Sequence, residues 1–434
     1  MAIDLLIGLQ WGDEGKGKNI DQLLSTGNYG GVARFQGGAN AGHTLKFDDK
    51  TFIGHIVPSG CLRENVELYV GNEVVVDAVS LIKEIGELKN LGFDVIPRLY
   101  ISNRAKLVSY MHPFLDLAEE SYRSKGGNKI GTTCRGIGPA YSDSRARRGL
   151  LIGDINFPDF KQKEEELSEL HMNILNMYKD KYGFEIMEDK IKEAKVAWLK
   201  AIDEIRKLQI CDLSHLIQKR LSEGKHILAE GAQGVMLDLD FGDYPNVTSS
   251  NVLPANVCLG LGVPHTAIRD IYGVTKTYTT KVGGGDFPSR IKDKEIEKLF
   301  QTAGNEFGAT TGRPRMCGWF DLFAIRYAIK LSGVNKLFIN KADICPTEEI
   351  EVVTNYEING KLSEEFPLRL NQITDVKTEK MLGWGDSNYK VSDKEKISPA
   401  LIKYLNYIKE KLSDLNVKIV SVGTGPDRTH YFDL

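Results

Sequence analysis

A glycine-rich segment that directly follows a short apolar run is the feature that most limits how this chain can fold. Residues 3–8 read IDLLIG, and residues 12–18 read GDEGKGK. A buried strand followed by the pattern GxxxxGK is typical of a phosphate-binding loop, whose backbone N–H groups surround phosphate oxygens at the start of a helix. The segment therefore predicts a strand, a phosphate loop and a helix in that order.

The phosphate loop departs from the usual pattern at one position. Asn19 stands where an ordinary loop carries Ser or Thr, whose hydroxyl binds Mg²⁺. Asp13, inside the loop, is the obvious candidate to hold the metal instead. The alternative is a glycine-rich turn that binds nothing, and the strand in front of the loop argues against it.

A second motif lies much later in the chain. Residues 340–343 read NKAD and follow the apolar residues 336–339. They fit NKxD, the pattern that reads guanine in GTP-binding proteins. The ionised carboxylate of Asp343 can accept hydrogen bonds from N1–H and the amino group of guanine, whereas adenine would leave this acid unpaired. The alternative is a surface turn that matches by chance, but the position after a strand favours a guanine site.

A third segment, residues 37–44, places His43 in a glycine-rich loop. A histidine held in such a loop can titrate near neutral pH and act as a general acid or hydrogen-bond donor. Most single histidines are structural, and we expect this of His112, His171, His215 and His265.

Several further segments, each interpreted as a loop, combine Gly with Thr, Arg or Gln. Arginine makes forked contacts to carboxylate or phosphate. Each segment alone would more often be a structural turn, but together they favour a site that binds several anionic ligands. They are residues 131–139, Arg145, Arg147, Arg148, and residues 230–234, 247–250, 304–315 and 423–428.

The distribution of apolar residues predicts an α/β fold with a largely parallel central sheet flanked by helices. Amphipathic helices are expected over residues 75–91, with Val79, Ile82, Ile85 and Leu88 on one face, and over residues 397–412. Buried strands are expected at residues 3–8, 66–70, 226–229, 336–340 and 417–422.

We expect residues 1–434 to form a single domain, because no linker or repeat interrupts the chain. Residues 160–225 are rich in Lys and Glu with periodic apolar positions, which predicts a helical excursion or subdomain. The sequence gives this segment no function.

Composition excludes some classes of partner. The chain is 41% hydrophobic and 26% charged with a formal net charge of −3, so nothing in the bulk indicates nucleic acid or an anionic membrane. No apolar run is long enough to span a membrane, and the N-terminus lacks the features of a signal peptide. The six cysteines are scattered without zinc-type spacing, which favours free thiols in the cytoplasm.

Nine motifs in a fixed order give the chain a family resemblance. It resembles the adenylosuccinate synthetases from about residue 5 to residue 430, which is almost the whole sequence. The motifs are WGDEGKGK, GGANAGHT, GTTCRGIGPAY, ARRG, EGAQG, VTSSN, NEFGATTGRPR, NKAD and GTGPDR. No single motif decides the matter, but nine in order make coincidence implausible.

The resemblance implies an enzyme that ligates L-aspartate to IMP with GTP, giving adenylosuccinate, GDP and phosphate through a 6-phosphoryl-IMP intermediate. This is the first committed step of AMP synthesis from IMP. It also implies one Mg²⁺ per subunit, a cytoplasmic homodimer and a P-loop-NTPase-like fold built on one large sheet.

The resemblance also implies roles for particular residues in catalysis. Asp13 resembles the general base that takes the proton from N1 of IMP, and His43 resembles the general acid that hydrogen-bonds the phosphoryl group. The implied catalytic residues are Asp13, Lys16, His43 and Gln233, and the implied Mg²⁺ ligands are Asp13 and the carbonyl of Gly42.

The implied ligand contacts cover all of the motifs. For GTP they are Gly12, Asp13, Glu14, Gly15, Lys16, Gly17, Lys18, Gly42, His43, Thr44, Arg315, Lys341, Ala342, Asp343, Gly423, Thr424 and Gly425. For IMP they are Asp13, Glu14, Gly15, Lys16, Asn40, Ala41, Gly42, His43, Thr133, Arg147, Gln233, Thr248 and Arg313, with Arg147 reaching the partner subunit's site. For aspartate they are Ala309, Thr310, Thr311, Gly312, Arg313, Pro314 and Arg315.

Three positions differ from the usual family pattern. Met316 stands where many members carry arginine, Asp286 replaces a usual proline, and Lys281 stands where arginine is common. None of them belongs to the implied base, acid or guanine motif.

Three other functions fit part of the pattern. A related synthetase that acts on dGMP would lack the aspartate in the glycine loop, but Asp13 is present. A GTP-hydrolysing switch protein would carry Ser or Thr at the position of Asn19. A catalytically dead binding protein would not be expected to retain Asp13, Lys16 and His43.

Overall fold

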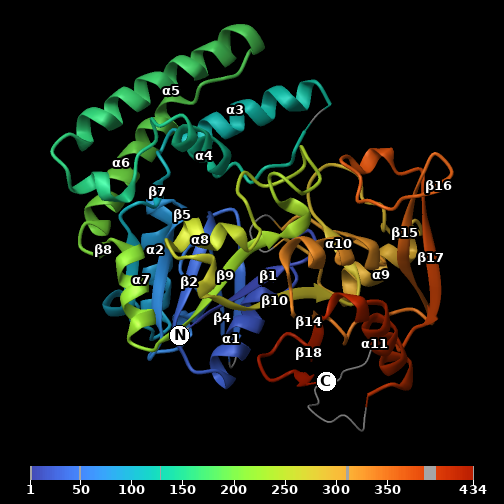
Figure 1. The fold of residues 1–434 in the computed structure, drawn as a ribbon. Helices are drawn as coiled ribbons and strands as arrows, with labels where there is room; N and C mark the ends of the chain where they lie inside the picture. The colour runs from blue at the N-terminus through green and yellow to red at the C-terminus, as the bar shows by residue number, and fades with distance from the viewer. Residues whose placement is uncertain (1, 48–49, 128, 309–311, 386–396, 434) are drawn as a thin grey trace.

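The computed structural model describes residues 2–47, 50–127, 129–308, 312–385 and 397–433. Its centre is an 11-stranded sheet in which all pairings within the described residues are parallel except that of β18 with β19 (Figure 1). In sheet order its strands are β19 (Tyr431–Asp433), β18 (Lys418–Gly423), β14 (Lys336–Asn340), β10 (Ile268–Lys276), β1 (Ile3–Gly8), β9 (His226–Gly234), β2 (Tyr29–Gly38), β5 (Glu67–Val76), β6 (Leu99–Ser102) and β8 (Gln209–Cys211), while β7 (Lys106–Leu107) pairs with β5. The predicted α/β fold is confirmed.

Helices pack around this sheet, which is why its central strands are buried on both faces. All six residues of β1 are buried. The helices are α1 (Lys16–Thr26), α2 (Ala78–Asn90), α3 (His112–Lys125), α4 (Ile137–Arg145), α5 (Phe160–Tyr182), α6 (Glu188–Ile205), α7 (Leu213–Ser222), α8 (Ala255–Leu261), α9 (Lys294–Ala303), α10 (Leu322–Ser332) and α11 (Pro399–Lys411). Strands and helices therefore largely alternate along the chain, as its apolar pattern predicts.

All five predicted strands form, and two of them are longer than predicted. The run at 66–70 continues as β5 to Val76, and the run at 226–229 continues as β9 to Gly234. The segment 230–234 was expected to be a loop, and this expectation is wrong. It stays in the sheet because β1 and β9 pair up to Gly8 and Gly234 after a register shift.

The two predicted helices form with shifted ends. Residues 75 and 76 belong to β5, and α2 starts at Ala78 because the side chain of Asp77 caps it. Val79 was expected on the buried face but is 42% exposed, since the face that packs inward contains Leu81, Ile85 and Leu88. Helix α11 buries Leu401, Tyr404, Leu405 and Ile408, in agreement with its predicted spacing.

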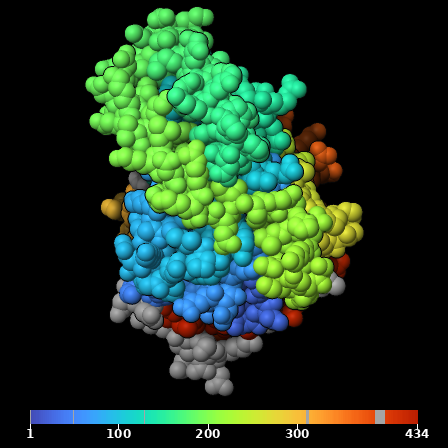
Figure 2. All heavy atoms as spheres, turned by 90° about the vertical axis from the view of Figure 1, so that its left-hand side faces the viewer, coloured from blue at the N-terminus to red at the C-terminus, as the bar shows by residue number. Residues whose placement is uncertain are grey.

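Residues 160–225 form the long helices α5 and α6, followed by the edge strand β8 and helix α7. Together with α3 and α4, the helices α5 and α6 gather on one side of the sheet (Figure 1). Figure 2 shows this helical part projecting beyond the body that contains the N-terminal strands. Contacts of α3 with α4 and α5 hold this part together, and contacts of α2 with α6 and of α4 with β5 and β7 attach it to the rest of the chain.

Smaller sheets surround the large one. The hairpin of β3 (His43–Phe47) and β4 (Lys50–Gly54) follows β2 directly. Strands β11 (Thr279–Lys281) and β12 (Met316–Gly318) form a second pair. A four-stranded sheet contains β13 (Phe320–Asp321), β15 (Glu349–Ile358), β16 (Lys361–Leu362) and β17 (Asp375–Leu382).

None of the helices in the described part of the chain combines the length and apolarity that a membrane crossing requires.

Candidate active site

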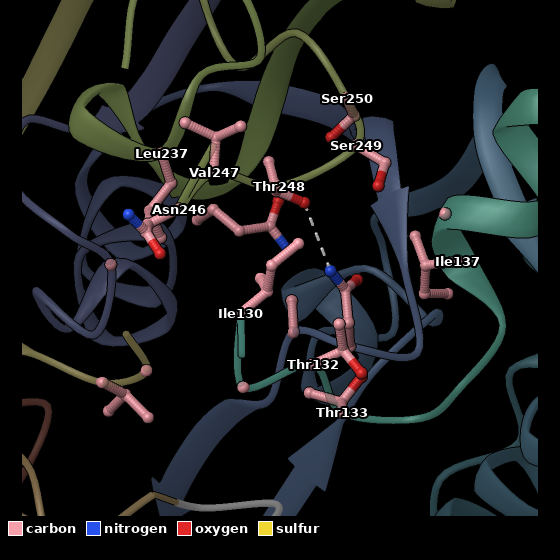
Figure 3. A pocket seen from close by; sticks show the side chains of 18 of the residues that line it. Ile130, Thr132, Thr133, Ile137, Leu237, Asn246, Val247, Thr248, Ser249 and Ser250 are labelled. Atoms are coloured by element: carbon pink, nitrogen blue, oxygen red, sulfur yellow. Dashed lines mark hydrogen bonds between the residues drawn. The ribbon is translucent and has the colours of Figure 1, made fainter. Parts of the chain in front are cut away.

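A cavity of about 1090 Å³ lies where the parallel strands β1, β2 and β9 end. Ligands of open parallel sheets bind at this edge, since the loops that follow the strands converge there. Thr132 and Thr133 face this pocket from one segment, and Thr248 and Ser249 from another segment far along the chain (Figure 3). The predicted site residues that line it are Gly12, Asp13, Gly15, Lys16, Gly17, Asn40, Ala41, Gly42, His43, Thr44, Thr133, Gln233, Thr248, Arg313 and Arg315.

The phosphate loop follows β1 as predicted, and a buried carboxylate inside the loop shapes it. Gly15, with a φ of 91°, is the N-cap of α1. Oε1 of Glu14 accepts hydrogen bonds from the N–H groups of Gln10 and Gly12. Oε2 of Glu14 lies 2.7 Å from Nζ of Lys16, and both side chains are buried. Glu14 therefore bonds to the protein rather than to the cavity, and its charge is paired with that of Lys16.

Asp13 keeps its carboxylate at the cavity, where its side chain is 36% exposed. Its Oδ2 lies 2.7 Å from Nε of Arg315. Arg315 also donates from Nη1 to Oε2 of Glu306, which is fully buried. Glu306 in turn lies 3.2 Å from Nζ of Lys276, so a chain of alternating charges runs from the core to Asp13.

The guanine motif is tied directly to the phosphate loop. Nδ2 of Asn340 donates to the carbonyl of Glu14 at 2.6 Å and to Oδ1 of Asn19 at 2.7 Å. The residue that replaces the usual Ser or Thr thus bonds to the protein. Nζ of Lys18 donates to the carbonyls of Gly425 and His430, so this lysine holds the loop after β18.

Asp343 lies beside the end of β18, because the N–H of Ala342 donates to the carbonyl of Gly423 at 2.9 Å. Burial raises the pKa of Asp343, and the nearby Lys341 and Lys18 oppose that rise. Oδ1 of Asp343 is buried with no hydrogen-bond partner among the described residues. A ligand that brings N–H donors would satisfy this oxygen.

His43 was expected in a loop, but it is the first residue of β3, and Gly37 and Gly38 of the same segment end β2. Its Nδ1 is in close contact with Oε1 of Glu230. Burial lowers the pKa of His43, and Glu230 acts in the opposite direction. His43 Nε2 has no hydrogen-bond partner in the described part of the chain.

Glu230 is a functional residue that the sequence motifs contain but did not single out. It is fully buried and also accepts hydrogen bonds from N–H and Oγ of Ser59. Burial alone would raise the pKa of Glu230, but His43, Arg34 and Ser59 hold it at about 2. The carboxylate therefore stays charged and fixes the His43 ring.

Some of the buried polar atoms that lack a hydrogen-bond partner belong to predicted site residues. Buried polar groups are nearly always hydrogen-bonded, because leaving one unpaired costs about 1–3 kcal/mol. Among the described residues, the predicted site residues with such atoms are Asn40 (Oδ1), His43 (Nε2), Gln233 (Oε1 and Nε2), Asp343 (Oδ1) and Thr424 (Oγ1). Asn40, His43 and Gln233 line the cavity, whereas Asp343 and Thr424 are not among the described residues that line it.

The implied aspartate loop is described only in part. Ala309, Thr310 and Thr311 lie outside the described residues. Gly312 and Pro314 flank Arg313, whose Nη1 donates to the carbonyl of Gly131 at 3.3 Å. Arg313 and Arg315 both line the cavity.

Arg147 lies apart from the cavity. It occupies the exposed turn after α4 with a φ of 63° and is not among the described residues that line the cavity.

The three departures from the family pattern lie together. Lys281 is buried, and its Nζ donates to Oδ2 of Asp243 and to the carbonyl of Asp286. Lys281 is also the residue that pairs with Met316 between β11 and β12. The three unusual residues thus form one local set in which the lysine charge is paired.

Comparison with known proteins decides the family. The sequence model described as adenylosuccinate synthetase matches residues 5–432. The chain belongs to the adenylosuccinate synthetase family. The family member of Cytophaga hutchinsonii is 42% identical over 434 residues, covering 99% of this chain and 97% of that protein. The member of Parabacteroides distasonis is 42% identical over 429 residues, covering 99% and 98%.

Solved structures agree with this membership. The fully ligated adenylosuccinate synthetase of Plasmodium falciparum superposes with a TM-score of 0.91 at 33% identity, covering 100% of both chains. The succinoaminodeoxyadenylate synthetase of cyanophage S-2L, solved with dGMP and dATP, has a TM-score of 0.62 at 20% identity and covers 100% of this chain and 95% of that one. The second likeness shows a shared fold. The chain is thus an enzyme of a ligase family of purine biosynthesis.

One buried cluster outside the cavity resembles a metal site. His112, Asp143 and His171 bring three potential ligand atoms within 4.8 Å of one another. Both imidazole Nε2 atoms already hydrogen-bond to Oδ2 of Asp143. Mg²⁺ prefers oxygen ligands, so this cluster does not fit the implied metal. The expected structural role of the two histidines agrees with these hydrogen bonds.

Proposed function

We propose that this chain ligates L-aspartate to IMP with GTP as co-substrate, releasing adenylosuccinate, GDP and phosphate. The observation that carries the proposal is the set of unpaired buried atoms on Asn40, His43, Gln233 and Asp343. Asn40, His43 and Gln233 offer donors and acceptors to a purine nucleotide, and Asp343 offers an acceptor to guanine. Family membership supplies the reaction class.

The reaction has to activate O6 of IMP, because this oxygen is a poor leaving group. Asp13 takes the proton from N1 of IMP, which makes O6 nucleophilic, and O6 attacks the γ-phosphorus while GDP leaves. The amine of aspartate then adds at C6 and phosphate departs. Lys16 donates to the transferring phosphoryl group, and Gln233 hydrogen-bonds IMP.

The proton state of His43 follows from its surroundings. Nδ1–H donates to Glu230, so Nε2 points to the ligand and donates only when the ring is protonated. Burial lowers the pKa of His43 in the free protein. An anionic phosphoryl group beside Nε2 raises that pKa again, because it favours the charged ring. His43 therefore gains its proton when the nucleotides bind.

Mg²⁺ fits the oxygen atoms at the phosphate loop. The Asp13 carboxylate is at the cavity surface and Gly42 lines the same wall, and both offer the oxygen ligands that this ion prefers. The metal would bind through these two groups and neutralise negative charge on the phosphates. Arg315 must leave Oδ2 of Asp13, or share it, when the metal binds.

We further propose that the enzyme acts as a homodimer in the cytoplasm. Arg147 is exposed and separate from the cavity of its own chain, which suits a contact with the IMP phosphate of the partner subunit. The family resemblance supports both parts of this proposal.

Phosphate release by the purified protein tests the reaction. We expect GTP and Mg²⁺ to give phosphate only when IMP and aspartate are both present, with an ultraviolet shift toward a succinylated purine. Replacement of IMP by dGMP tests the related synthetase reaction, and we expect no turnover. Phosphate release from GTP alone, unchanged by IMP and aspartate, would instead support a GTP-hydrolysing switch and overturn the proposal.

A further inference from the structure

Helix α3 carries three buried polar residues on one face. His112, Asp116 and Glu120 are spaced four residues apart, which places them in a row along the helix. They are 0%, 7% and 6% exposed, respectively. Buried charged groups are uncommon unless they are paired, so the contacts of this row are informative.

Glu120 holds the segment that leads to Thr133. Its Oε1 accepts from the N–H of Gly131 at 2.6 Å and of Thr132 at 3.3 Å, and its Oε2 accepts from Ile130 at 3.4 Å. Three consecutive backbone donors therefore share one carboxylate. The other side of this segment contacts Arg313, through the carbonyl of Gly131.

Asp116 holds the next part of the same loop. Its Oδ2 accepts from the N–H of Gly136 at 3.0 Å. Gly136 has a φ of 72° and is the N-cap of α4. A Cβ at this glycine would lie 2.5 Å from Cβ of His112, so the start of α4 packs directly on α3.

His112 extends the row to the turn that carries Arg147. Its Nδ1 accepts from the N–H of Ser109, so Nε2 carries the proton and donates to Oδ2 of Asp143 at 2.9 Å. Oδ1 of the same carboxylate accepts from Nε of Arg148 at 2.8 Å. Backbone N–H groups of Arg148 and Gly149 also donate to the carbonyl of Asp143, which closes the turn.

We propose that His112, Asp116 and Glu120 are positioning residues that hold the loop 130–136 and the turn 143–149 in the shape that binds the phosphate of IMP. The inference rests on the proposed function, because the IMP contacts of Thr133 and Arg147 are part of that proposal. The carboxylates act through the backbone N–H groups they bind, since a direct approach to phosphate would be repulsive. Helix α3 thus sets the affinity for IMP and leaves the guanine pocket, on the other side of the phosphate loop, unchanged.

Limited proteolysis tests the anchoring without any nucleotide. Lys129 is exposed next to the anchored segment, and trypsin cleaves after lysine. We expect Glu120→Ala to be cleaved after Lys129 at least about tenfold faster than the wild type, because opening of the segment is no longer opposed. Glu120→Gln retains one acceptor and should be intermediate. Glu169→Gln, at an exposed position of α5 away from the cavity, is the control and should be cleaved like the wild type.

Steady-state kinetics of the same variants tests the consequence for IMP. We expect Glu120→Ala and Asp116→Asn to raise KM for IMP by about tenfold or more, with KM for GTP within about twofold of the wild type. Equal increases in both KM values would indicate general damage to the fold and overturn the positioning role. Unchanged cleavage and an unchanged KM for IMP in Glu120→Ala would also overturn it. Glu120→Ala could be cleaved faster although the wild type shows no IMP-dependent phosphate release. This result would preserve the anchoring role but overturn the assignment to IMP.

Discussion

The side chain of Asn340 donates a hydrogen bond to Oδ1 of Asn19 at a distance of 2.7 Å. Asn340 begins the guanine motif, and Asn19 is the residue that departs from the ordinary phosphate loop. The same Nδ2 also reaches the carbonyl of Glu14. The departure therefore joins the predicted guanine motif to the predicted phosphate loop, and the position of one depends on the other.

Asn19→Thr restores the usual phosphate-loop residue, and we expect it to weaken the enzyme. The shorter side chain cannot preserve both the reach and the geometry of the contact with Asn340, so KM for GTP should rise about tenfold, as expected for one lost buried hydrogen bond. Asn19→Ala is the comparison and should behave alike. A lower KM for GTP in Asn19→Thr than in the wild type would show that the hydroxyl serves the metal after all.

Asp13→Asn tests the general base. The amide preserves size but cannot take a proton, so turnover should fall by about 10²-fold or more while GTP still binds. Turnover and titration with a fluorescent GTP analogue measure the two effects separately. A variant that retains a tenth of the wild-type turnover would rule out the base assignment.

Glu230→Gln tests how His43 is charged and oriented. The neutral amide no longer stabilises a protonated ring, so the pKa of His43 should fall further and turnover should drop by about 10²-fold. The pH dependence of turnover and the NMR titration of His43 would report this change. Glu64→Gln, at an exposed position, is the control. An unchanged His43 titration in Glu230→Gln would contradict the pairing.

Asp343→Asn should change the nucleotide that the enzyme prefers. An asparagine offers one acceptor and one donor, which matches the 2-oxo group of xanthine better than the amino group of guanine. We expect KM for GTP to rise by about 10²-fold and KM for XTP to fall, because each mismatched buried polar contact costs about 1–3 kcal/mol. ATP should remain a poor co-substrate in both proteins. A preference for GTP that survives the substitution would place guanine recognition elsewhere.

The lowered pKa of Glu306 predicts that the folded protein loses stability in acid. Burial alone would raise its pKa, but Lys276, Lys341 and Arg315 lower it to about 2 from the ordinary 4.5. A carboxyl group with a lowered pKa stabilises the fold above pH 4.5, and this stabilisation is lost as the pH falls toward 2. Urea unfolding of the wild type should therefore show a lower midpoint across this window.

Glu306→Gln should remove that part of the acid dependence and destabilise the protein at neutral pH. Loss of one partner from a buried ion pair costs roughly 3–5 kcal/mol, because Lys276 is left charged and unpaired. Glu295→Gln, at an exposed position of α9, should change stability by less than about 0.5 kcal/mol. Equal unfolding midpoints for Glu306→Gln and the wild type would contradict the pairing.

The strands and the main motifs could be predicted from sequence because local patterns determine them. Apolar runs mark buried strands wherever the fold is α/β, and GDEGKGK and NKAD have local meaning. Val79 shows the limit, since helical spacing permits two neighbouring faces and only packing chooses between them. The segment 230–234 shows another limit, because glycine suggests a loop while pairing with β1 keeps it in the sheet.

Most supporting residues of the site could not be predicted because their partners are distant in sequence. Glu230 and His43 are 187 positions apart, and Glu306 and Lys276 are 30 positions apart, so these pairs form only after the chain has folded. Arg315 is just nine positions after Glu306, but nothing in the local pattern marks this contact. A buried acid in a sequence looks like any surface acid. The contact of Asn19 with Asn340 is of the same kind, since it joins residues 321 positions apart.

The place of β1 between β9 and β10 also affects how the protein is made. Within the described residues, β1 pairs with residues 226–234 and 268–276, which are made long after it. Until about residue 234 has emerged, its buried side chains have no neighbouring strand to join, and non-local pairing of this kind is slow and exposed to aggregation. We therefore expect the strand before the nucleotide loop to stay unpaired until these residues are made, so a chain truncated before residue 226 should aggregate or depend on chaperones.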